Sequence, residues 1–361
     1  MSRDLRGENK QSIMIVAAYN KFRLWVLAWT YVGLLIFLAS LVTRKRMSHN
    51  NGVAASGRFK IVPDPRFPAH DFFEPGREFV CRLRHASVSF WDDVTPQVRS
   101  ASLKLADTNY EAPLDLEMNT GDISVFWSAW NFILFIWYGA TRGTIPGAKR
   151  FYDRFPGGLL GAQAGVRSPP SSFSQLYYYN ETPMLFTGKD GVKRYVKYRL
   201  IPEDRGPESG LLTDEEKSHV WDLLAKEDET RSRNYLKQEF EQRITTSGAT
   251  YHLEMQLHAA APDDSPEIFN SNVLWDEETH PFLALGTVTL DKMVSFNDCC
   301  LTRYSLTQQP PSLGIIPATS LDDYNSMNYM RSVTGPVKAT RLFFYKIFGM
   351  PKPLPDQGPR N

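Results

Sequence analysis

The chain has 361 residues, which is enough for one large domain or two of ordinary size. Lys and Arg number 41 and Asp and Glu number 40, and this balance argues against a nucleic-acid-binding protein, which normally carries a basic excess. A hydrophobic content of 42% excludes a disordered chain, and three cysteines (Cys81, Cys299 and Cys300) make neither a disulfide framework nor a Cys-rich zinc or iron–sulfur site. This use of cysteine favours a reducing compartment, so the body of the chain is expected in the cytosol.

The N-terminal region is dominated by an uncharged run at residues 24–43. A helix of this length can cross the hydrocarbon core of a bilayer. Lys21 and Arg23 precede the run and basic residues at 44–46 follow it, so we predict a single-pass transmembrane anchor preceded by a polar segment at residues 1–23. A cleaved signal peptide is the alternative, but the run is too long for one and no small-residue cleavage site precedes the basic cluster. Basic residues are equally numerous on both sides, which leaves the orientation undecided.

Short strand-like runs and two helical patterns follow the anchor. Strands early and late in the chain, with helices between and after them, predict an α+β fold built around an antiparallel barrel. In the last strand-like run, apolar and polar residues alternate strictly, which is typical of a strand with one buried face. The first helical pattern opens with a capping box. The expected strands are 79–83, 86–90, 101–105, 194–202 and 250–258, and the expected helices are 213–227 and 228–243.

The uncharged, aromatic-rich segment at residues 123–139 allows three interpretations. It is marginal in length for a second membrane span. It also fits a core strand that runs into a buried helix, or an apolar surface that rests on the bilayer beside the anchor. We favour the strand and helix, with a contribution from the apolar surface. The proline-rich tail at residues 349–361 is expected to be disordered.

Two motifs hold residue types that can bind metals or nucleotides, but neither has the arrangement that such a site needs. His252, Glu254, Gln256 and His258 share one strand face and are residue types found around zinc or iron, but such sites usually need ligands from several elements. A polar strand face is the simpler interpretation. The glycine-rich run at residues 157–165 has neither dinucleotide-binding nor P-loop spacing, and the sequence contains no G-x-S-x-G elbow.

Longer segments, found in a fixed order, carry the most specific signal in the chain. They are DPRFPAHDFF (64–73), RLRHA (82–86), PLDLEMNTGDISVFW (113–127), LYYYNETPM (176–184), KDGVKRYVKYRLIP (189–202), VLWDEETHPF (273–282), and QPPSLG and DDYNSM between residues 309 and 327. Together they resemble the catalase-like haem proteins, and most closely the coral-type allene oxide synthases, which act on fatty-acid hydroperoxides. The resemblance extends from residue 46 to residue 341. It implies a catalase-like antiparallel β-barrel core with surrounding helices at residues 44–348, and haem b as cofactor.

The resemblance assigns residues to the distal side of the haem. The family's distal histidine follows a basic residue by three, which matches Arg46 and His49, with Ser48 as the hydroxyl-bearing neighbour. In this chemistry the imidazole hydrogen-bonds the peroxide and moves a proton between its oxygens. Asn119, in the family's M-N-T-G motif, is expected to orient the peroxide as an amide. Arg46 and Ser48 are expected to contact the cofactor, whereas His85 falls in a later strand and is expected to be structural.

The proximal side departs from the family pattern. The family holds the iron with a tyrosinate in an R-x-x-x-Y arrangement, in which the arginine keeps the tyrosine anionic. Here Arg331 is present but Gly335 stands at the tyrosine position, and glycine has no side chain that can bind iron. The same spacing recurs at Arg341 and Tyr345, where a shifted helix would present Tyr345 as the axial ligand. Three states stay open: haem held by Tyr345, haem held by water or another group at Gly335, or no haem.

The resemblance predicts a membrane-anchored haem enzyme for a hydrophobic, fatty-acid-type hydroperoxide. The reaction would be a rearrangement or dehydration, as in a hydroperoxide lyase or dehydratase, or a reduction, as in a peroxidase-like oxidoreductase. His49 lies six residues beyond the expected span, so the pocket would open near the bilayer, where such substrates partition. The alternative is a degenerate member that lacks the axial tyrosine and acts without haem as a pathway accessory or binding protein. A catalase for hydrogen peroxide fits the matched segments less well.

Overall fold

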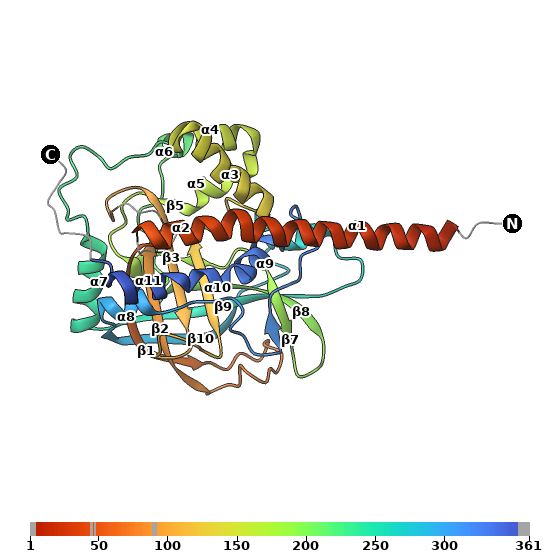
Figure 1. Ribbon diagram of the computed structural model, residues 1–361. Helices are drawn as coiled ribbons and strands as arrows, with labels where there is room; N and C mark the ends of the chain where they lie inside the picture. Colours follow the sequence, from red (N-terminus) through yellow and green to blue (C-terminus); the bar gives the residue numbers. More distant parts are fainter. Residues whose placement is uncertain (1–4, 44–45, 47, 89–91, 353–361) are drawn as a thin grey trace.

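A closed antiparallel barrel stands at the centre of the molecule (Figure 1). The computed structural model describes residues 5–43, 46, 48–88 and 92–352. The strands pair in the order β1-β2-β3-β4-β6-β8-β9-β10, and β10 returns to β1 to close the ring. This confirms the α+β barrel expected from the sequence. The barrel strands are β1 (Asn51–Ile61), β2 (Glu78–Ser87), β3 (Gln97–Lys104), β4 (Asp115–Thr120), β6 (Tyr178–Tyr179), β8 (Lys193–Pro202), β9 (Ala249–Ala259) and β10 (Leu283–Met293).

Alternation along the strands fills the barrel with apolar side chains. In β9, Tyr251, Leu253 and Met255 are fully buried in the core, as the sequence pattern predicts. Burial of each such side chain stabilises the fold by about 1.5–3 kcal/mol. On the opposite face, Glu254 forms an ion pair with Arg199 at 2.6 Å. The polar face of this strand therefore has a structural use.

The structure corrects some of the expected boundaries. The strand expected at 79–83 and the first two residues of the one expected at 86–90 belong to one strand, β2, because the residues between them keep their extended pairing with both neighbouring strands. Residues 89 and 90 of the second expected strand lie outside the described residues. The helix expected at 213–227 begins with the predicted capping box but is confined to α6 (Asp214–Ser218). It ends at His219, whose backbone leaves the helical region.

The second expected helix begins later than predicted. In place of residues 228–243, the helix is α7 (Tyr235–Thr246). Its buried side chains, Leu236, Phe240 and Ile244, recur every four residues and pack against the barrel core. This apolar stripe starts only at residue 236, which explains why the preceding residues do not join the helix.

Three helices cover one side of the barrel: α3 (Ala129–Arg142), α4 (Thr144–Arg154) and α5 (Pro156–Gly165). For the segment at 123–139, the helical part of the interpretation is confirmed by α3, which Ser128 caps at its N-terminus. The strand expected before it is absent from this described segment, which is irregular up to Ser128.

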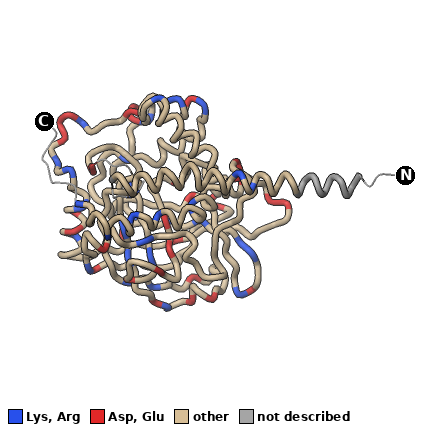
Figure 2. The backbone as a smooth tube through the Cα atoms, in the orientation of Figure 1, with Lys and Arg blue, Asp and Glu red and all other residues tan. Residues whose placement is uncertain are grey.

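A long N-terminal helix lies along the domain (Figure 1). It comprises α1 (Leu5–Leu27), a π-helical turn η1 (Ala28–Gly33) and α2 (Leu34–Thr43). Residues Ile15–Val42 form a helix that is long and apolar enough to cross a membrane, judged by length and composition. In Figure 2 the stretch that passes over the domain carries no charged residue.

The N-terminal helix packs against three C-terminal helices, α9 (Ser326–Val333), α10 (Gly335–Lys338) and α11 (Thr340–Phe348). One cluster of buried side chains joins Leu24 and Ala28 to Met330 of α9 and Val337 of α10. The anchor expected from the sequence is therefore packed on the barrel domain. The remaining elements are β5 (Val166–Arg167), η2 (Phe173–Gln175), β7 (Met184–Thr187), η3 (Pro266–Phe269), α8 (Phe296–Leu301) and β11 (Leu313–Gly314). Most of the expected disordered tail, residues 353–361, lies outside the described residues.

A glycine at the bulge between β1 and β10 makes the barrel sensitive to substitution. The register shifts between Ser56 and Gly57, where a Cβ would overlap the carbonyl oxygen of Thr289. We expect Gly57→Ala to lower the free energy of unfolding by about 1–3 kcal/mol in urea denaturation. The matched Gly139→Ala adds a Cβ that meets nothing within 4 Å on α3, and should be neutral or stabilising by up to about 1 kcal/mol. Equal stability of the two variants would contradict the close approach at the bulge.

Candidate functional site

A cavity of about 320 Å³ lies between the outer face of the barrel and the C-terminal helices. Its volume is within the range of small-molecule sites. Strand alternation builds its wall, because Leu83, Leu103 and Leu116 point into the barrel core while their neighbours in sequence point outward. The outward residues that line the cavity are Arg84 of β2, Ser100 and Ser102 of β3, and Glu117 and Asn119 of β4.

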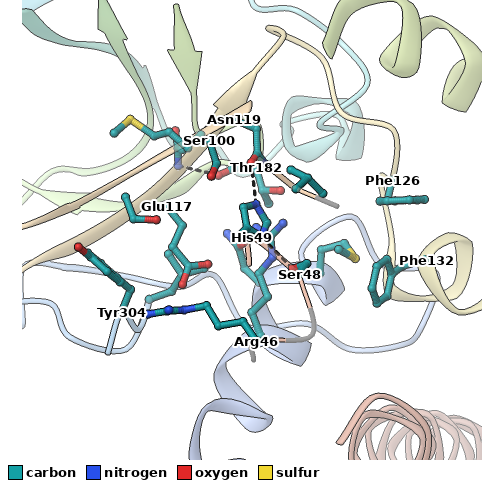
Figure 3. Close-up of a pocket in the computed structure, with 18 of the residues that line it drawn as sticks. Arg46, Ser48, His49, Ser100, Glu117, Asn119, Phe126, Phe132, Thr182 and Tyr304 are labelled. Atoms are coloured by element: carbon teal, nitrogen blue, oxygen red, sulfur yellow. Dashed lines mark hydrogen bonds between the residues drawn. The ribbon is translucent and has the colours of Figure 1, made fainter. Parts of the chain in front are cut away.

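The cavity has a polar side and an apolar side (Figure 3). His49 lies near the middle, with Glu117 and Tyr304 on one side and Phe126 and Phe132 on the other. The N-terminal helix also contributes apolar side chains to the wall. This arrangement suits a ligand that has an apolar body and a polar or charged group.

His49 is held in place by its backbone and by two side chains. Its φ of 58° is in the left-handed region, which is uncommon for a residue other than glycine. The His49 N–H donates to the Val88 carbonyl at 2.9 Å, and Arg84 Nη2 donates to the His49 carbonyl at 2.7 Å. Ser48 Oγ lies 2.7 Å from Nδ1 of the imidazole, and Asn119 Oδ1 lies 3.4 Å from Nε2. The structure therefore brings together His49, Ser48 and Asn119, three of the residues that the resemblance assigned to the distal side.

The imidazole of His49 is neutral at physiological pH. Burial, and then the positive charge of Arg84, lower its pKa to about 4. A neutral imidazole has one N–H donor and one acceptor nitrogen. With Asn119 Oδ1 facing it, Nε2–H donates to the amide oxygen and Nδ1 accepts from Ser48 Oγ. In the other tautomer Nδ1–H donates to Ser48 Oγ, and Nε2 can accept a proton from a bound acid once the Asn119 amide turns its NH2 group toward the ring.

Five arginines line the cavity, and three of them, Arg46, Arg84 and Arg341, lie close enough together for their charges to interact. Burial, and then the charges of Arg84 and Arg341, lower the pKa of Arg46 to about 9. Arg46 and Arg341 donate to the Thr302 carbonyl at 2.6 and 2.9 Å. The Nε atoms of Arg84 and Arg341 are buried and have no hydrogen-bond partner among the described residues. Within that part of the chain none of the three pairs with a carboxylate, so the cluster is suited to an acidic ligand.

The sequence analysis missed two carboxyl groups in the cavity, those of Glu117 and Glu181. Glu117 faces Lys338 of α10 at 3.7 Å. Although burial opposes its ionisation, Lys338 and Arg331 hold the pKa of Glu117 below its usual value. Burial raises the pKa of Glu181 to about 7. A signal for Glu117 was present, since it lies two residues before Asn119 on a strand and so shares its face. The sequence contains no comparable signal for Glu181.

The structure places the expected proximal residues apart from one another. Arg331 and Gly335 line the cavity, whereas Tyr345 is not among the lining residues. The Tyr345 hydroxyl lies beside the Arg341 guanidinium, and burial raises its pKa. A Cβ built on Gly335 would have Ser305 Oγ as its nearest contact, at 3.8 Å. A Cβ atom therefore fits at position 335, and Tyr345 does not line the cavity.

Two further side chains clarify the site. His85 lies inside the barrel, where its Nε2 is 2.9 Å from the Tyr251 hydroxyl and its ring stacks on Phe173 at 5.0 Å. It is fully buried and does not line the cavity. Tyr304 does line the cavity, and its buried hydroxyl has no hydrogen-bond partner in the described part of the chain. Nothing in the sequence pointed to Tyr304.

Sequence comparison finds relatives that match most or part of the chain. It is 37% identical over 291 residues to the allene oxide synthase-lipoxygenase protein of Plexaura homomalla, covering 80% of this chain and 27% of that protein. It is 26% identical over 270 residues to linolenate 9R-lipoxygenase of Nostoc sp., covering 72% of this chain and 33% of that protein. The uncharacterized protein y4iK of Sinorhizobium fredii is 30% identical over 170 residues, and the match covers 46% of this chain and 73% of that protein. The chain thus spans 27% and 33% of the length of the first two relatives. No protein-family model matches it.

Solved structures with the same fold include catalases. Catalase A from Saccharomyces cerevisiae superimposes with a TM-score of 0.64 at 16% identity, covering 84% of this chain and 63% of that one. A bacterial catalase gives a TM-score of 0.64 at 15% identity, covering 91% of this chain and 64% of that one. At this level of identity the likeness concerns the fold.

The depressed pKa of His49 makes stability depend on pH. Between pH 6.5 and about 4 the unfolded chain binds a proton at this imidazole and the folded chain does not, so the free energy of unfolding falls as pH falls. His49→Gln removes this loss. Between pH about 7.5 and about 5, the stability of the variant relative to wild type should rise by roughly 2 kcal/mol in urea denaturation. Parallel pH dependence of the two proteins would show that His49 titrates normally.

Proposed function

We propose that this chain, which has the catalase fold and is similar to the allene oxide synthase-lipoxygenase protein, acts on a hydrophobic, fatty-acid-type hydroperoxide bound in the cavity. The reaction is a rearrangement with loss of water, or a reduction. The observation that carries the proposal is the neutral His49 imidazole 3.4 Å from the Asn119 amide, at a cavity with an apolar side. The relationship to the allene oxide synthase-lipoxygenase protein supports the substrate class.

His49 is the acid–base group in this proposal. Its Nε2 accepts the proton of the hydroperoxide O–H and returns it to the oxygen that departs. The Asn119 amide orients the peroxide and takes no proton. Loss of water from a hydroperoxide conserves all atoms and needs no reductant, whereas reduction to an alcohol requires an electron donor supplied from outside.

Haem b is the cofactor that the fold family implies, and the residues present fit its acidic edge. Haem carries carboxylate side chains, and the arginine cluster offers buried guanidinium groups with unpaired Nε atoms on Arg84 and Arg341. Arg46, Arg84 and Arg341 would hold these carboxylates, and His49 would face the distal side. When bound, haem supplies an iron that can cleave the O–O bond of a peroxide.

The residues do not fit the family's axial position. Gly335 has no ligating atom, and Tyr345 does not line the cavity. Tyr304 lines the cavity, but burial raises its pKa and keeps the phenol protonated. When haem is bound, the arginine cluster would hold it, whereas neither Gly335 nor Tyr345 would supply a side-chain ligand to its iron.

A second candidate function is that of a haem-free accessory or binding protein. Two observations favour it: the glycine at position 335, and the ion pair of Glu117 with Lys338, which joins the barrel wall to α10 at the cavity. This candidate keeps the cavity and its cationic cluster for an acidic, apolar ligand. The two candidates differ in cofactor content and share the same fold.

We also propose that the N-terminal helix attaches the protein to a membrane, with the body in the cytosol. The apolar character of Ile15–Val42 supports the attachment. The cytosolic placement rests on the free cysteines, Cys81, Cys299 and Cys300.

Substitution of His49 tests the proposed chemistry. Turnover of a fatty-acid hydroperoxide by His49→Gln should fall by about 10²–10⁴-fold, because glutamine cannot take up the proton. The control is His219→Gln, which changes a histidine paired with Asp222 on α6's C-terminal side, away from the cavity. It should retain wild-type turnover. Undiminished turnover in His49→Gln would show that His49 is not the acid–base group of the reaction.

Restoring the family's tyrosine tests the proximal side. Gly335→Tyr should slow the transfer of bound haem to a haem-scavenging protein by about tenfold or more, and should produce the absorption bands of a phenolate ligand. Gly139→Tyr adds the same side chain on α3, away from the cavity, and should leave the transfer rate unchanged. Identical transfer rates in both variants would show that residue 335 does not face the iron.

A further inference from the structure

The N-terminal helix forms part of the cavity wall. Val32, Ile36 and Ser40 line the cavity and are buried. They continue a stripe of buried residues, spaced by four, that begins with Leu24 and Ala28. The hydroxyl of Ser40 donates to the Ile36 carbonyl at 2.7 Å, so no unpaired hydroxyl is left on this wall. The apolar stretch of the N-terminal helix thus forms one wall of the cavity.

The C-terminal helices hold the N-terminal helix against the domain. Phe37 packs edge-on against Phe344 of α11, with ring centroids 5.6 Å apart. A Cβ on Gly33 would lie 3.7 Å from Val337 of α10, an ordinary contact distance. Met330 of α9 belongs to the same buried cluster as the helix. Because α9 and α10 also carry the proximal residues of the cavity, the helix and the site form one packed unit.

A membrane-spanning arrangement conflicts with this packing. A spanning helix needs about 20 consecutive apolar residues in lipid. From Leu24 onward, however, one face of the helix is covered by protein, and only α1 extends beyond the domain (Figure 1). In that extension the uncharged stretch runs from residue 11 to residue 20, between Lys10 and Lys21. A helix of this length covers about 15 Å, roughly half of the hydrocarbon core.

The face of the helix that points away from the domain is apolar and exposed. Its residues are 38% to 78% exposed, and they include Trp25, Leu34, Leu38, Leu41 and Val42. Figure 1 shows α3 and α11 on the same side of the molecule, flanking this helix. Lys21 and Arg23 mark its edge, where they can meet anionic headgroups. The exposed apolar residues of the flanking helices are Trp130 and Trp137 of α3, and Phe343, Ile347 and Phe348 of α11.

We propose that the N-terminal helix lies in the plane of one membrane leaflet, docked on its own domain, and there forms one wall of the cavity. Its outer face is covered by lipid. A ligand dissolved in the leaflet then reaches the cavity beside this helix without crossing bulk water. The inference rests on the proposed membrane attachment and is independent of the proposed chemistry.

Labelling of introduced cysteines in sealed membrane vesicles tests the topology of the full-length chain. Lys10→Cys lies before the apolar stretch and Asp214→Cys is on exposed α6, each in a Cys300→Ser background. An impermeant maleimide should label both sites from the same side of the membrane, with the same detergent requirement. Labelling from opposite sides would overturn the proposal, as would loss of the Lys10→Cys site by cleavage of the N-terminal segment.

Vesicle flotation distinguishes an in-plane helix from a protein that does not bind lipid. Full-length wild type should float with vesicles containing anionic lipid, and Leu38→Glu with Leu41→Glu should reduce the floating fraction by about tenfold. Wild type that stays at the bottom would overturn both this inference and the proposed attachment. Flotation with opposite-side labelling would overturn the in-plane arrangement alone.

Paired tryptophan variants test the cavity wall. Ile36→Trp enlarges a side chain that lines the cavity and should weaken binding of oleic acid by about tenfold, whereas Leu38→Trp on the exposed face should leave it unchanged. Circular dichroism checks that both variants fold. Equal binding by two folded variants would show that this helix does not bound the ligand site, and if Ile36→Trp does not fold, the labelling result decides.

Discussion

Three guanidinium groups that have no carboxylate partner among the described residues, two of them buried (those of Arg84 and Arg341), are the constraint around which the site is organised. Removing a charge from water is costly, and hydrogen bonds to backbone carbonyls compensate only in part. Arg46 and Arg341 share the Thr302 carbonyl, and two arginine Nε atoms have no partner among the described residues. A ligand with acidic groups would compensate the desolvation cost of these guanidinium groups and accept hydrogen bonds from the unpaired Nε atoms. The distal histidine, the apolar walls and the N-terminal helix all surround the same cavity.

Strand register decides which residues meet at the cavity. In β2, β3 and β4 the leucines fill the barrel, so Arg84, Glu117 and Asn119 must face outward. A shift of one residue in any of these strands would bury a charge and expose a leucine. The position of His49 is set by the start of β1 and by the Arg84 hydrogen bond to its carbonyl. Barrel stability and site geometry are thus consequences of one alternating pattern.

Sequence reasoning reached the barrel and the distal residues but not the placement of the N-terminal helix. Alternation in β9 and the matched segments were sufficient for the fold, and the structure sets His49 beside Asn119, 70 residues apart in the chain. An apolar run is equally compatible with lipid and with a protein surface, so composition alone could not reveal the packing of Ile36 against the cavity. Periodic spacing also could not show that Tyr345 does not line the cavity, because that depends on how α11 packs.

The central claim is that the arginine cluster holds the acidic edge of haem although Gly335 offers no axial side chain. The most direct measurement is the haem content of full-length protein purified from haem-replete cells, taken by absorption spectroscopy and haem extraction. The account predicts stoichiometric haem in wild type and strongly reduced haem in Arg84→Met, with Arg150→Met on α4 as a surface control. Colourless wild-type protein with an intact fold would contradict it and leave the haem-free binding protein as the better account.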